Sequence, residues 1–403
     1  MKIAFAFFEQ FIGISGGIEH VCCNLANALS RRGHEISIIY CYGHSGNAFY
    51  PLDKEVKLYN LMTMHPEKWK RPALGKCVSG SDRAVREILR IFSKSAAREW
   101  NESAKGRMIR TEIRDVLAEV EPDIILSYRY ETSNYLLNFA QTQIPVVTMF
   151  HMTPDTVLPD APKGELLAIE KSACAQVLMK GDIEKVKKHC PRATVEWIPN
   201  AVPQYEEKAD LKAPKSAYKI INAARLNKAQ KRQHLLVEAF SMLAEDFPEW
   251  TVELWGGGDD TQYAYAEELR QLIHHKNLDD RVFLKGESTH ILDEYLKADI
   301  FCFPSAYEGF GLSMAEAMSA GIPAVAFRSC AAVSELIQDG QTGVLANDGA
   351  DHLAAALKEL MQDQERRATM GEKARESMKE YAPERIWDMW EDLLKRYAVQ
   401  GRK

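Results

Sequence analysis

The chain has 403 residues, of which 46% are hydrophobic and 27% are charged, a composition typical of folded globular proteins. At roughly 150 residues per domain, this length predicts two or three domains. The composition excludes a largely disordered chain, a collagen-like fibre and a small disulfide scaffold. The net charge of −6 argues against a general nucleic-acid-binding protein.

The charge is unevenly distributed along the chain. Residues 1–199 hold 26 basic and 23 acidic side chains, whereas the remainder holds 25 basic and 34 acidic ones. Opposite signs in the two halves predict two domains with different partners. No apolar run reaches the roughly 18 residues of a membrane span, and the first residues are typical of a strand rather than a signal peptide. The eight scattered cysteines form no metal-binding spacing, which favours reduced thiols in the cytoplasm.

Short apolar, β-rich runs alternate with amphipathic helical patterns such as 18–32 and 233–246. The predicted strands are 2–8, 35–42, 123–128, 145–150, 175–180, 194–199, 219–225, 251–256, 281–285, 300–304, 323–327 and 343–346. Such alternation predicts parallel sheets with right-handed helical crossovers. Since the pattern restarts after a proline-bounded polar stretch at 204–218, we predict an α/β protein of two Rossmann-like domains, residues 1–203 and 204–382, facing each other across a cleft.

Two further segments interrupt this alternation. Residues 66–115 hold 13 basic and seven acidic side chains, and their spacing predicts one basic face on one helix: Arg83, Arg86, Arg90, Lys94 and Arg98. Two interpretations stay open, a solvated helix face and a surface that meets anionic lipid headgroups or an acceptor phosphate. Residues 383–403 form the other segment. Pro383 opens a helix whose apolar stripe should pack back on the N-terminal domain.

The segment after the predicted strand 300–304 carries the strongest signal for chemistry. Gly309 and Gly311 flank Phe310, and a helical pattern begins at Leu312. A glycine turn at a helix start presents unpaired N–H groups to an anion. It also lies at the carboxyl end of a strand, where open α/β sheets bind ligands. The turn therefore predicts a phosphate site, and the alternative is a plain strand–turn–helix joint.

Two glutamates bracket this turn. Glu316 should lie in the first helical turns, where a carboxylate can accept hydrogen bonds from two neighbouring ribose hydroxyls. Glu308 should lie in the loop, nearer the phosphates and the sugar. An acid beside a diphosphate costs electrostatic free energy unless cations offset it.

The string E-G-F-G-L-x-x-x-E at 308–316 resembles the two-glutamate motif of the family-four retaining glycosyltransferases, which have the GT-B fold. Further similarities follow in the family's order through most of the chain. They comprise the glycine loop with Gly16 and Gly17, the Pro-Asn step at Asn200, Arg225 followed by Lys231, the glycine-rich strand end 255–258, and the closing turn 339–343.

The resemblance implies roles for particular residues. Arg225 and Lys231 clamp the diphosphate and stabilise its departure, which planar and point charges do well. Glu308 is a stabiliser, and His151, after the strand 145–150, contacts the transferred sugar from the N-terminal domain. The predicted catalytic residues are Glu308, His151, Arg225 and Lys231. The predicted nucleotide-sugar-binding residues are Gly16, Gly17, Asn200, Arg225, Lys231, Gly256, Glu287, Gly309, Phe310, Gly311, Leu312 and Glu316.

The sequence also departs from the family's pattern. Lys231 lies six residues after Arg225 where many members have five, so Lys228 could share its role. Residues 329–332 replace a frequent glycine-rich turn, which leaves the sugar open.

The resemblance therefore implies a retaining glycosyltransferase that moves a hexose or N-acetylhexosamine from a nucleotide diphosphate sugar to a hydroxyl acceptor. UDP is favoured over GDP, no metal or other cofactor is expected, and a lipid-linked or envelope glycan is the expected acceptor. The basic segment adds an anionic membrane surface as a partner, at the cytoplasmic face of the membrane. The alternatives are a non-catalytic sugar-binding protein and a nicotinamide oxidoreductase. The latter lacks the G-x-G-x-x-G order in 13–17 and gives 305–323 no role.

Overall fold

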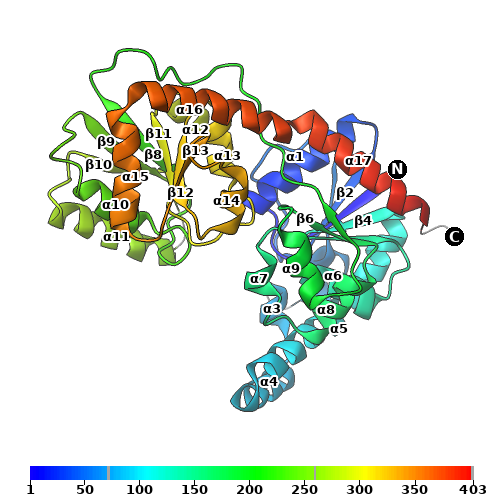
Figure 1. Ribbon diagram of the computed structural model, residues 1–403. Coiled ribbons are helices and arrows are strands. Elements are labelled where there is room, and N and C mark those ends of the chain that lie inside the picture. Colours follow the sequence, from blue (N-terminus) through cyan, green and yellow to red (C-terminus); the bar gives the residue numbers. More distant parts are fainter. Residues whose placement is uncertain (70–72, 258–259, 401–403) are drawn as a thin grey trace. The chain divides into compact units, whose positions relative to one another are not determined.

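The computed structural model describes residues 1–69, 73–257 and 260–400. The chain forms two compact units: Met1–Pro199 together with Ile386–Lys403, and Asn200–Arg385. Both units alternate strands and helices (Figure 1).

The strands of the first unit are β1 (Lys2–Ala6), β2 (Glu35–Tyr40), β3 (Lys57–Asn60), β4 (Ile124–Ser127), β5 (Val146–Met149), β6 (Cys174–Val177) and β7 (Val195–Trp197). The strands of the second are β8 (Tyr218–Ala223), β9 (Trp250–Trp255), β10 (Val282–Gly286), β11 (Ile300–Phe303), β12 (Ala324–Phe327) and β13 (Gly343–Ala346).

The helices that begin in the first unit are α1 (Gly17–Arg31), α2 (Leu61–Met64), α3 (Leu74–Cys77), α4 (Gly80–Phe92), α5 (Lys94–Val120), α6 (Tyr130–Asn134), α7 (Pro154–Val157), α8 (Lys163–Lys171) and α9 (Asp182–His189). Those that begin in the second are α10 (Gln233–Ser241), α11 (Asp260–His275), α12 (Ile291–Tyr295), α13 (Leu312–Ser319), α14 (Ala331–Leu336), α15 (Ala350–Gln362), α16 (Gln364–Ser377) and α17 (Pro383–Gln400). Three short helices of other types are η1 (Pro66–Lys68), η2 (Tyr135–Ala140) and η3 (Met378–Tyr381).

Both sheets are parallel and share one topology. The first has the order β3-β2-β1-β4-β5-β6-β7 and the second β10-β9-β8-β11-β12-β13. Each unit thus repeats the doubly wound order 3-2-1-4-5-6, in which the direction of winding reverses between the first and fourth strands. These reversals lie between β1 and β4 and between β8 and β11, and ligands of such sheets bind beyond the strand ends there. The predicted α/β, two-Rossmann fold is confirmed.

Every strand predicted from the sequence is present, with ends shifted by a few residues, but β3 was missed. Lys57 is exposed and the two residues after it are only half-buried, because β3 is an edge strand. Its sequence therefore lacks the continuous apolar run that marks β4 and β5, whose residues are all buried.

Helix α17 contributes to the first unit from Ile386 onward. Trp390, Leu393 and Leu394 are buried on its inner face. Ion pairs join its outer edges to the same unit, with 2.7 Å between Arg32 Nη1 and Asp388 Oδ1. The apolar stripe and these pairs together fix the helix on that unit.

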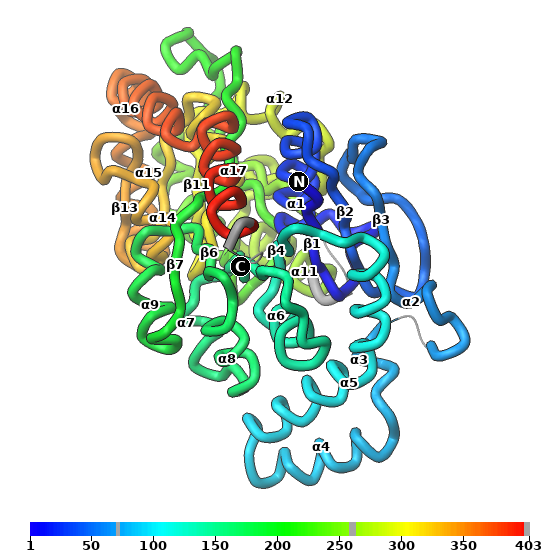
Figure 2. Tube along the Cα trace, turned by 90° about the vertical axis from the view of Figure 1, so that its right-hand side faces the viewer, coloured from blue at the N-terminus to red at the C-terminus, as the bar shows by residue number. Residues whose placement is uncertain are grey.

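The prediction of a single basic helix at 83–98 is wrong. Ser93 has extended backbone angles, ends α4, and accepts a hydrogen bond from the Ala96 N–H as the N-cap of α5. The predicted basic side chains therefore lie on two helices, which pack on each other (Figure 2). Arg86 and Arg90 pair with Glu87, so they do not form a free basic face. Within the described residues, no helix combines the length and apolar character that crossing a bilayer requires.

Candidate active site

Two loops of the second unit meet at the reversal point of its sheet. One follows β8 and the other follows β11, and these strands are neighbours. The amide N–H of Ala306 donates to the Gln230 carbonyl at 2.7 Å, and the Gln230 side chain donates to the Tyr307 carbonyl at 3.2 Å. These bonds hold the two loops together, and no sequence pattern indicated the role of Gln230.

The best-defined charged contact in these loops joins two predicted catalytic residues. Lys231 Nζ lies 2.6 Å from Glu308 Oε1, and the side chains are only 14% and 8% exposed. The ammonium also lies 5.0 Å from the ring centre of Phe303 on β11, a cation–π contact. A fixed cation and a fixed carboxylate therefore stand together beyond the strand ends.

The glycine turn that follows Glu308 leads directly into α13. Gly311 has φ +93°, a conformation that favours glycine, and is the N-cap of this helix. Because glycine offers no side-chain cap, no side chain covers the first N–H groups of α13, and such a helix start suits an anion. Phe310 is buried and packs edge-on against Tyr381 at 5.5 Å between ring centres, which anchors the turn.

Glu316 lies on α13, and burial raises its pKa to about 7. Its charge also contributes to the raised pKa of Tyr205 and Tyr295, so both phenols lie near it. Neither tyrosine was predicted, because each is distant in sequence from the glutamate motif. At neutral pH this carboxyl exchanges between a hydrogen-bond donor and an acceptor.

The end of β9 lies close to the end of β8. Gly256 has φ +139°, and a Cβ there would lie 2.0 Å from the Ala224 carbonyl oxygen. A Cβ at the next residue, Gly257, would lie 2.6 Å from Cγ of Glu287. These glycines bring Glu287, which follows β10, to the same edge of the sheet. The predicted glycine-rich strand end continues to Gly258, which lies outside the described residues.

Three more predicted or considered residues of this unit differ in their surroundings. Arg225 is exposed just after β8. Within the described ranges no hydrogen bond or ion pair holds its guanidinium. Lys228 instead pairs with Glu268 at 2.5 Å on the surface. Asn200 is buried where the second unit begins.

The glycine loop of the first unit has a different environment. Gly16 is the N-cap of α1 and Gly17 is its first residue. The carboxylate of Glu19 folds back over this loop, since a Cβ on Gly16 would lie 1.8 Å from Glu19 Oε2. An acid thus stands where an anion would approach the helix start. The predicted contact of this loop with phosphate stays a prediction.

His151 follows β5 in the first unit and stacks on Tyr128, with ring centres 5.2 Å apart and planes 11° from parallel. Burial, reinforced by the nearby Arg129 charge, lowers its pKa to about 3. The imidazole is therefore neutral at physiological pH, and its buried Nε2 has no hydrogen-bond partner in the part of the chain described. Tyr128 follows β4, so the strand order brings these rings together.

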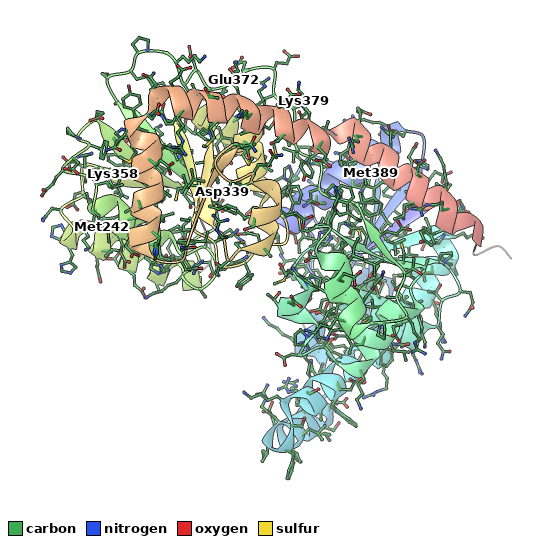
Figure 3. The ribbon with its side chains drawn as sticks, viewed as in Figure 1. Met242, Asp339, Lys358, Glu372, Lys379 and Met389 are labelled. Carbon is green, nitrogen blue, oxygen red and sulfur yellow. The ribbon has the colours of Figure 1, made fainter. Side chains whose placement is uncertain are left out.

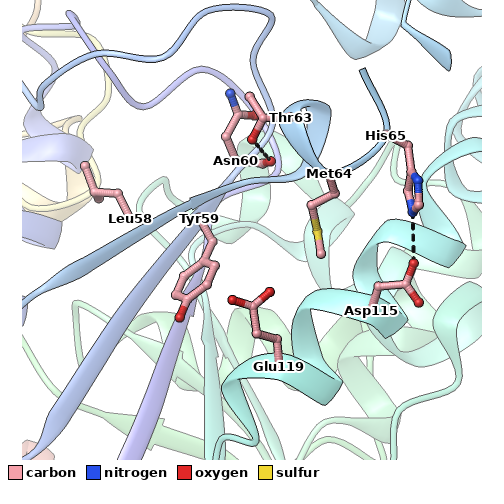
Figure 4. Close-up of a pocket in the computed structure, with 8 residues that line it drawn as sticks. All are labelled: Leu58, Tyr59, Asn60, Thr63, Met64, His65, Asp115 and Glu119. Carbon is pink, nitrogen blue, oxygen red and sulfur yellow. Dashed lines mark hydrogen bonds and ion pairs between the residues drawn. The ribbon is translucent and has the colours of Figure 1, made fainter. Parts of the chain in front are cut away.

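A cavity of about 430 Å³ lies elsewhere in the first unit, at the edge strand β3 (Figure 4). His65 and Asp115 both line it, and their side chains form a hydrogen bond of 3.1 Å. None of the predicted site residues lines this cavity, so it gives no support to the predicted chemistry.

Comparison with known families matches both halves of the chain. Residues 15–203 match the family model described as Glycosyltransferase Family 4, and residues 203–377 match that of Glycosyl transferases group 1. The two matches meet near the boundary of the structural units.

Relatives and solved structures agree with these matches. An exopolysaccharide phosphotransferase of Streptomyces coelicolor is 26% identical over 94% of this chain, although the chain spans only 39% of its length. An uncharacterized glycosyltransferase of Haemophilus influenzae is 24% identical over 96% of this chain and 99% of its own. The structure of TarM from S. aureus, in complex with fondaparinux, alpha-GlcNAc-glycerol and UDP, superposes with a TM-score of 0.74. It has 16% identity and covers 98% of this chain and 100% of its own.

The doubly wound sheets, the paired family matches and the shared two-unit fold lead to one identification. The chain is a glycosyltransferase of the GT-B type, with a family-4 region in its first half and a group-1 region in its second.

Proposed function

We propose that the protein is a retaining glycosyltransferase that moves a hexose or N-acetylhexosamine from a UDP-sugar to a hydroxyl of a lipid-linked or envelope glycan. The observation that carries this proposal is the 2.6 Å ion pair of Lys231 and Glu308 beside the uncapped start of α13. It supports a site built for the diphosphate of a nucleotide sugar.

The positive groups around this turn suit a leaving diphosphate. The N-terminal N–H groups of α13 and the Lys231 ammonium face the same loop, and the exposed Arg225 supplies a planar fork. As the glycosidic bond breaks, negative charge grows on the diphosphate, and fixed cations stabilise it. Because side chains supply this charge, we propose that the reaction needs no bound metal.

The acidic residues have separate roles in the proposal. Glu308 holds Lys231 in place and offsets positive charge that develops on the sugar. Glu316, in its ionised form, accepts hydrogen bonds from the ribose hydroxyls. Retention follows from attack on the face that the diphosphate leaves, with a phosphate oxygen taking the acceptor proton, so no side chain acts as an obligate nucleophile.

The nucleotide and acceptor are proposed from relatives as well as from the site. The TarM structure contains UDP and alpha-GlcNAc-glycerol, and the Streptomyces relative is described as acting on exopolysaccharide. These names favour UDP over GDP and an envelope glycan as the acceptor. We propose that the first unit, with the neutral His151, binds that acceptor, and that the enzyme works in the cytoplasm.

A panel of UDP- and GDP-sugars tests the proposal. We expect one UDP-sugar to raise the melting temperature most and then to be transferred to a crude lipid-linked glycan fraction, giving the α-anomer from an α-linked donor by NMR. Chelation with EDTA should leave the rate unchanged. Glu308→Gln should abolish transfer, while an exposed control, Glu245→Gln, should not.

Three results would contradict particular parts of this proposal. Preference for a GDP-sugar would show that the donor nucleotide is GDP and not UDP. Inversion of the anomeric configuration would exclude the retaining mechanism. Binding of a nucleotide sugar without transfer or hydrolysis would favour the non-catalytic alternative.

A further inference from the structure

Helix α4 turns its apolar side to the solvent. Ile88, Ile91 and Phe92 are 57%, 80% and 82% exposed, among the most exposed large hydrophobic side chains of the described residues. Residues three and four apart lie on one face of a helix, so these three form a continuous patch, which we call the α4 patch. A contiguous exposed apolar patch marks an interaction site.

Some of the charged side chains of α4 contact α5. Arg86 Nη1 donates to the Asn101 side chain at 3.4 Å, and Asp82 pairs with Arg107 at 3.3 Å. A surface helix of a globular protein normally does the reverse and buries its apolar face. Figures 1 and 2 show α4 as the outermost element at one end of the first unit, with α5 between it and the sheet. The α4 patch therefore faces away from the unit's core.

We infer that the α4 patch inserts into the surface of an anionic lipid bilayer. Exposed positive charge lies at the tip beside it, since Lys94 is exposed where α4 meets α5. Arg90 is also 60% exposed, although it pairs with Glu87. Residues 80–95 carry four basic and two acidic side chains, although the whole chain has a net charge of −6. An apolar face bordered by lysine and arginine is how interfacial helices bind membranes that contain acidic lipids.

The size of the patch favours a membrane over a second copy of the chain. A stable protein–protein interface uses about 20–30 residues on each side, whereas the exposed apolar surface here comes from three large side chains. Shallow insertion into a bilayer needs no matching surface of that size. The docking rests on α4 alone. The further claim that it brings the enzyme to a lipid-linked acceptor rests on the proposed function.

Vesicle co-sedimentation of the full chain tests the inference. The probes are vesicles of phosphatidylcholine and vesicles of phosphatidylcholine mixed with phosphatidylglycerol. We expect binding to the mixed vesicles that weakens with salt. The double variant Ile91→Asp with Phe92→Asp should lower partitioning by about tenfold or more, since it replaces two inserting side chains.

Two matched controls separate this effect from general ones. Met242→Asp changes a methionine that is 55% exposed on the other unit (Figure 3) and should leave partitioning unchanged. Lys94→Glu should reduce binding to mixed vesicles only, whereas Lys276→Glu, an exposed lysine outside this region, should have no effect. Donor binding, measured by calorimetry, should be equal in all variants. This measurement tests the proposed function independently of vesicle binding.

Two results would overturn the inference. One is that the parent chain binds neither kind of vesicle. The other is that the double variant and the parent chain partition equally onto the vesicles. If the parent chain instead sediments as a dimer that the double variant dissociates, and vesicles are not bound, then the α4 patch is an interface between two copies.

Discussion

Two glycine turns lead into helices beside the reversal points of the two sheets, one after β1 and the other after β11, and their charges differ. In the second unit, Gly311 precedes α13, and the nearby acid Glu308 is paired with Lys231. In the first unit, Gly16 precedes α1, and the acid Glu19 folds back over the glycine itself. Both helix starts carry a positive dipole end.

The comparison shows that a glycine turn at a helix start is not enough to make an anion site. A carboxylate that lies over the glycine itself, as that of Glu19 does, offsets a dipole end equivalent to roughly half a charge. At the other turn the carboxylate of Glu308 lies beside Lys231. We therefore propose that the diphosphate binds at the turn before α13, while a contact of the donor with the turn before α1 stays a prediction. Five predictions test this difference, and they are given in order of decreasing effect.

Lys231→Met should have the largest effect, because it removes the cation that pairs with the buried Glu308 carboxylate. We expect kcat/KM to fall by about 10²–10³-fold and the free energy of unfolding to fall by about 3 kcal/mol. The measurements are initial rates and urea denaturation. The control is Lys228→Met, whose exposed pair with Glu268 should be worth less than about 1 kcal/mol. Equal losses of kcat/KM and of unfolding free energy in the two variants would show that Lys231 contributes no more than Lys228.

Glu316→Gln should weaken UDP-sugar binding by about tenfold or more, because hydrogen bonds to a charged acceptor contribute about 1.5–3 kcal/mol. In the parent chain, the raised pKa of about 7 means that the accepting, ionised form gains population as the pH rises through 7. Donor affinity should therefore increase across that range and stay flat in the variant. Calorimetry at several pH values measures this.

For the Glu316 carboxyl we also expect the stability of the fold to depend on pH, in the direction opposite to donor affinity. Its folded pKa is raised, so the folded chain keeps a proton that the unfolded chain releases above its ordinary value of 4.5. The contribution to stability is therefore complete below about pH 4.5 and is lost as the pH rises through about 7. Denaturation curves of Glu316→Gln should lack this loss. An unchanged pH profile would show that the carboxyl is not desolvated.

Gly311→Ala, compared with Gly17→Ala, should show which of the two turns binds the donor. Its φ of +93° costs a residue with a Cβ about 1–2 kcal/mol, so the turn should shift and donor affinity should fall by about tenfold. Gly17→Ala is the matched control, since a Cβ there meets nothing within 4 Å and the residue has no positive φ. We expect it to keep both stability and donor affinity. Loss of donor binding in Gly17→Ala alone would place the diphosphate at the other turn.

Glu19→Gln should have the smallest effect. If the first turn does not bind the diphosphate, removing its carboxylate changes donor affinity by no more than about fivefold, the upper range of a helix-dipole interaction. A titration with UDP-sugar checks this. A loss greater than tenfold would mean that Glu19 contacts the donor, and the difference between the turns would then have another origin.

Much of the fold followed from local patterns. The buried strands and the glycine turns were predicted, because continuous apolar runs and glycine positions are properties of short segments. The edge strand β3 was missed because it pairs with a strand on one side only and is partly exposed, so its sequence has no continuous apolar run. The basic helix at 83–98 was misjudged, since periodicity alone did not show the break at Ser93.

Within the site, sequence patterns were enough to identify the residue types: a glycine turn, two glutamates, and the basic pair Arg225 and Lys231. Which of them meet depends on the three-dimensional fold. Lys231 and Glu308 are 77 residues apart and become neighbours because β8 and β11 are adjacent in the sheet. Strand order depends on the packing of the whole unit, and so does the direction in which a charged side or the α4 patch faces. A one-dimensional pattern gives the periodicity of a helix but not which of its faces is covered.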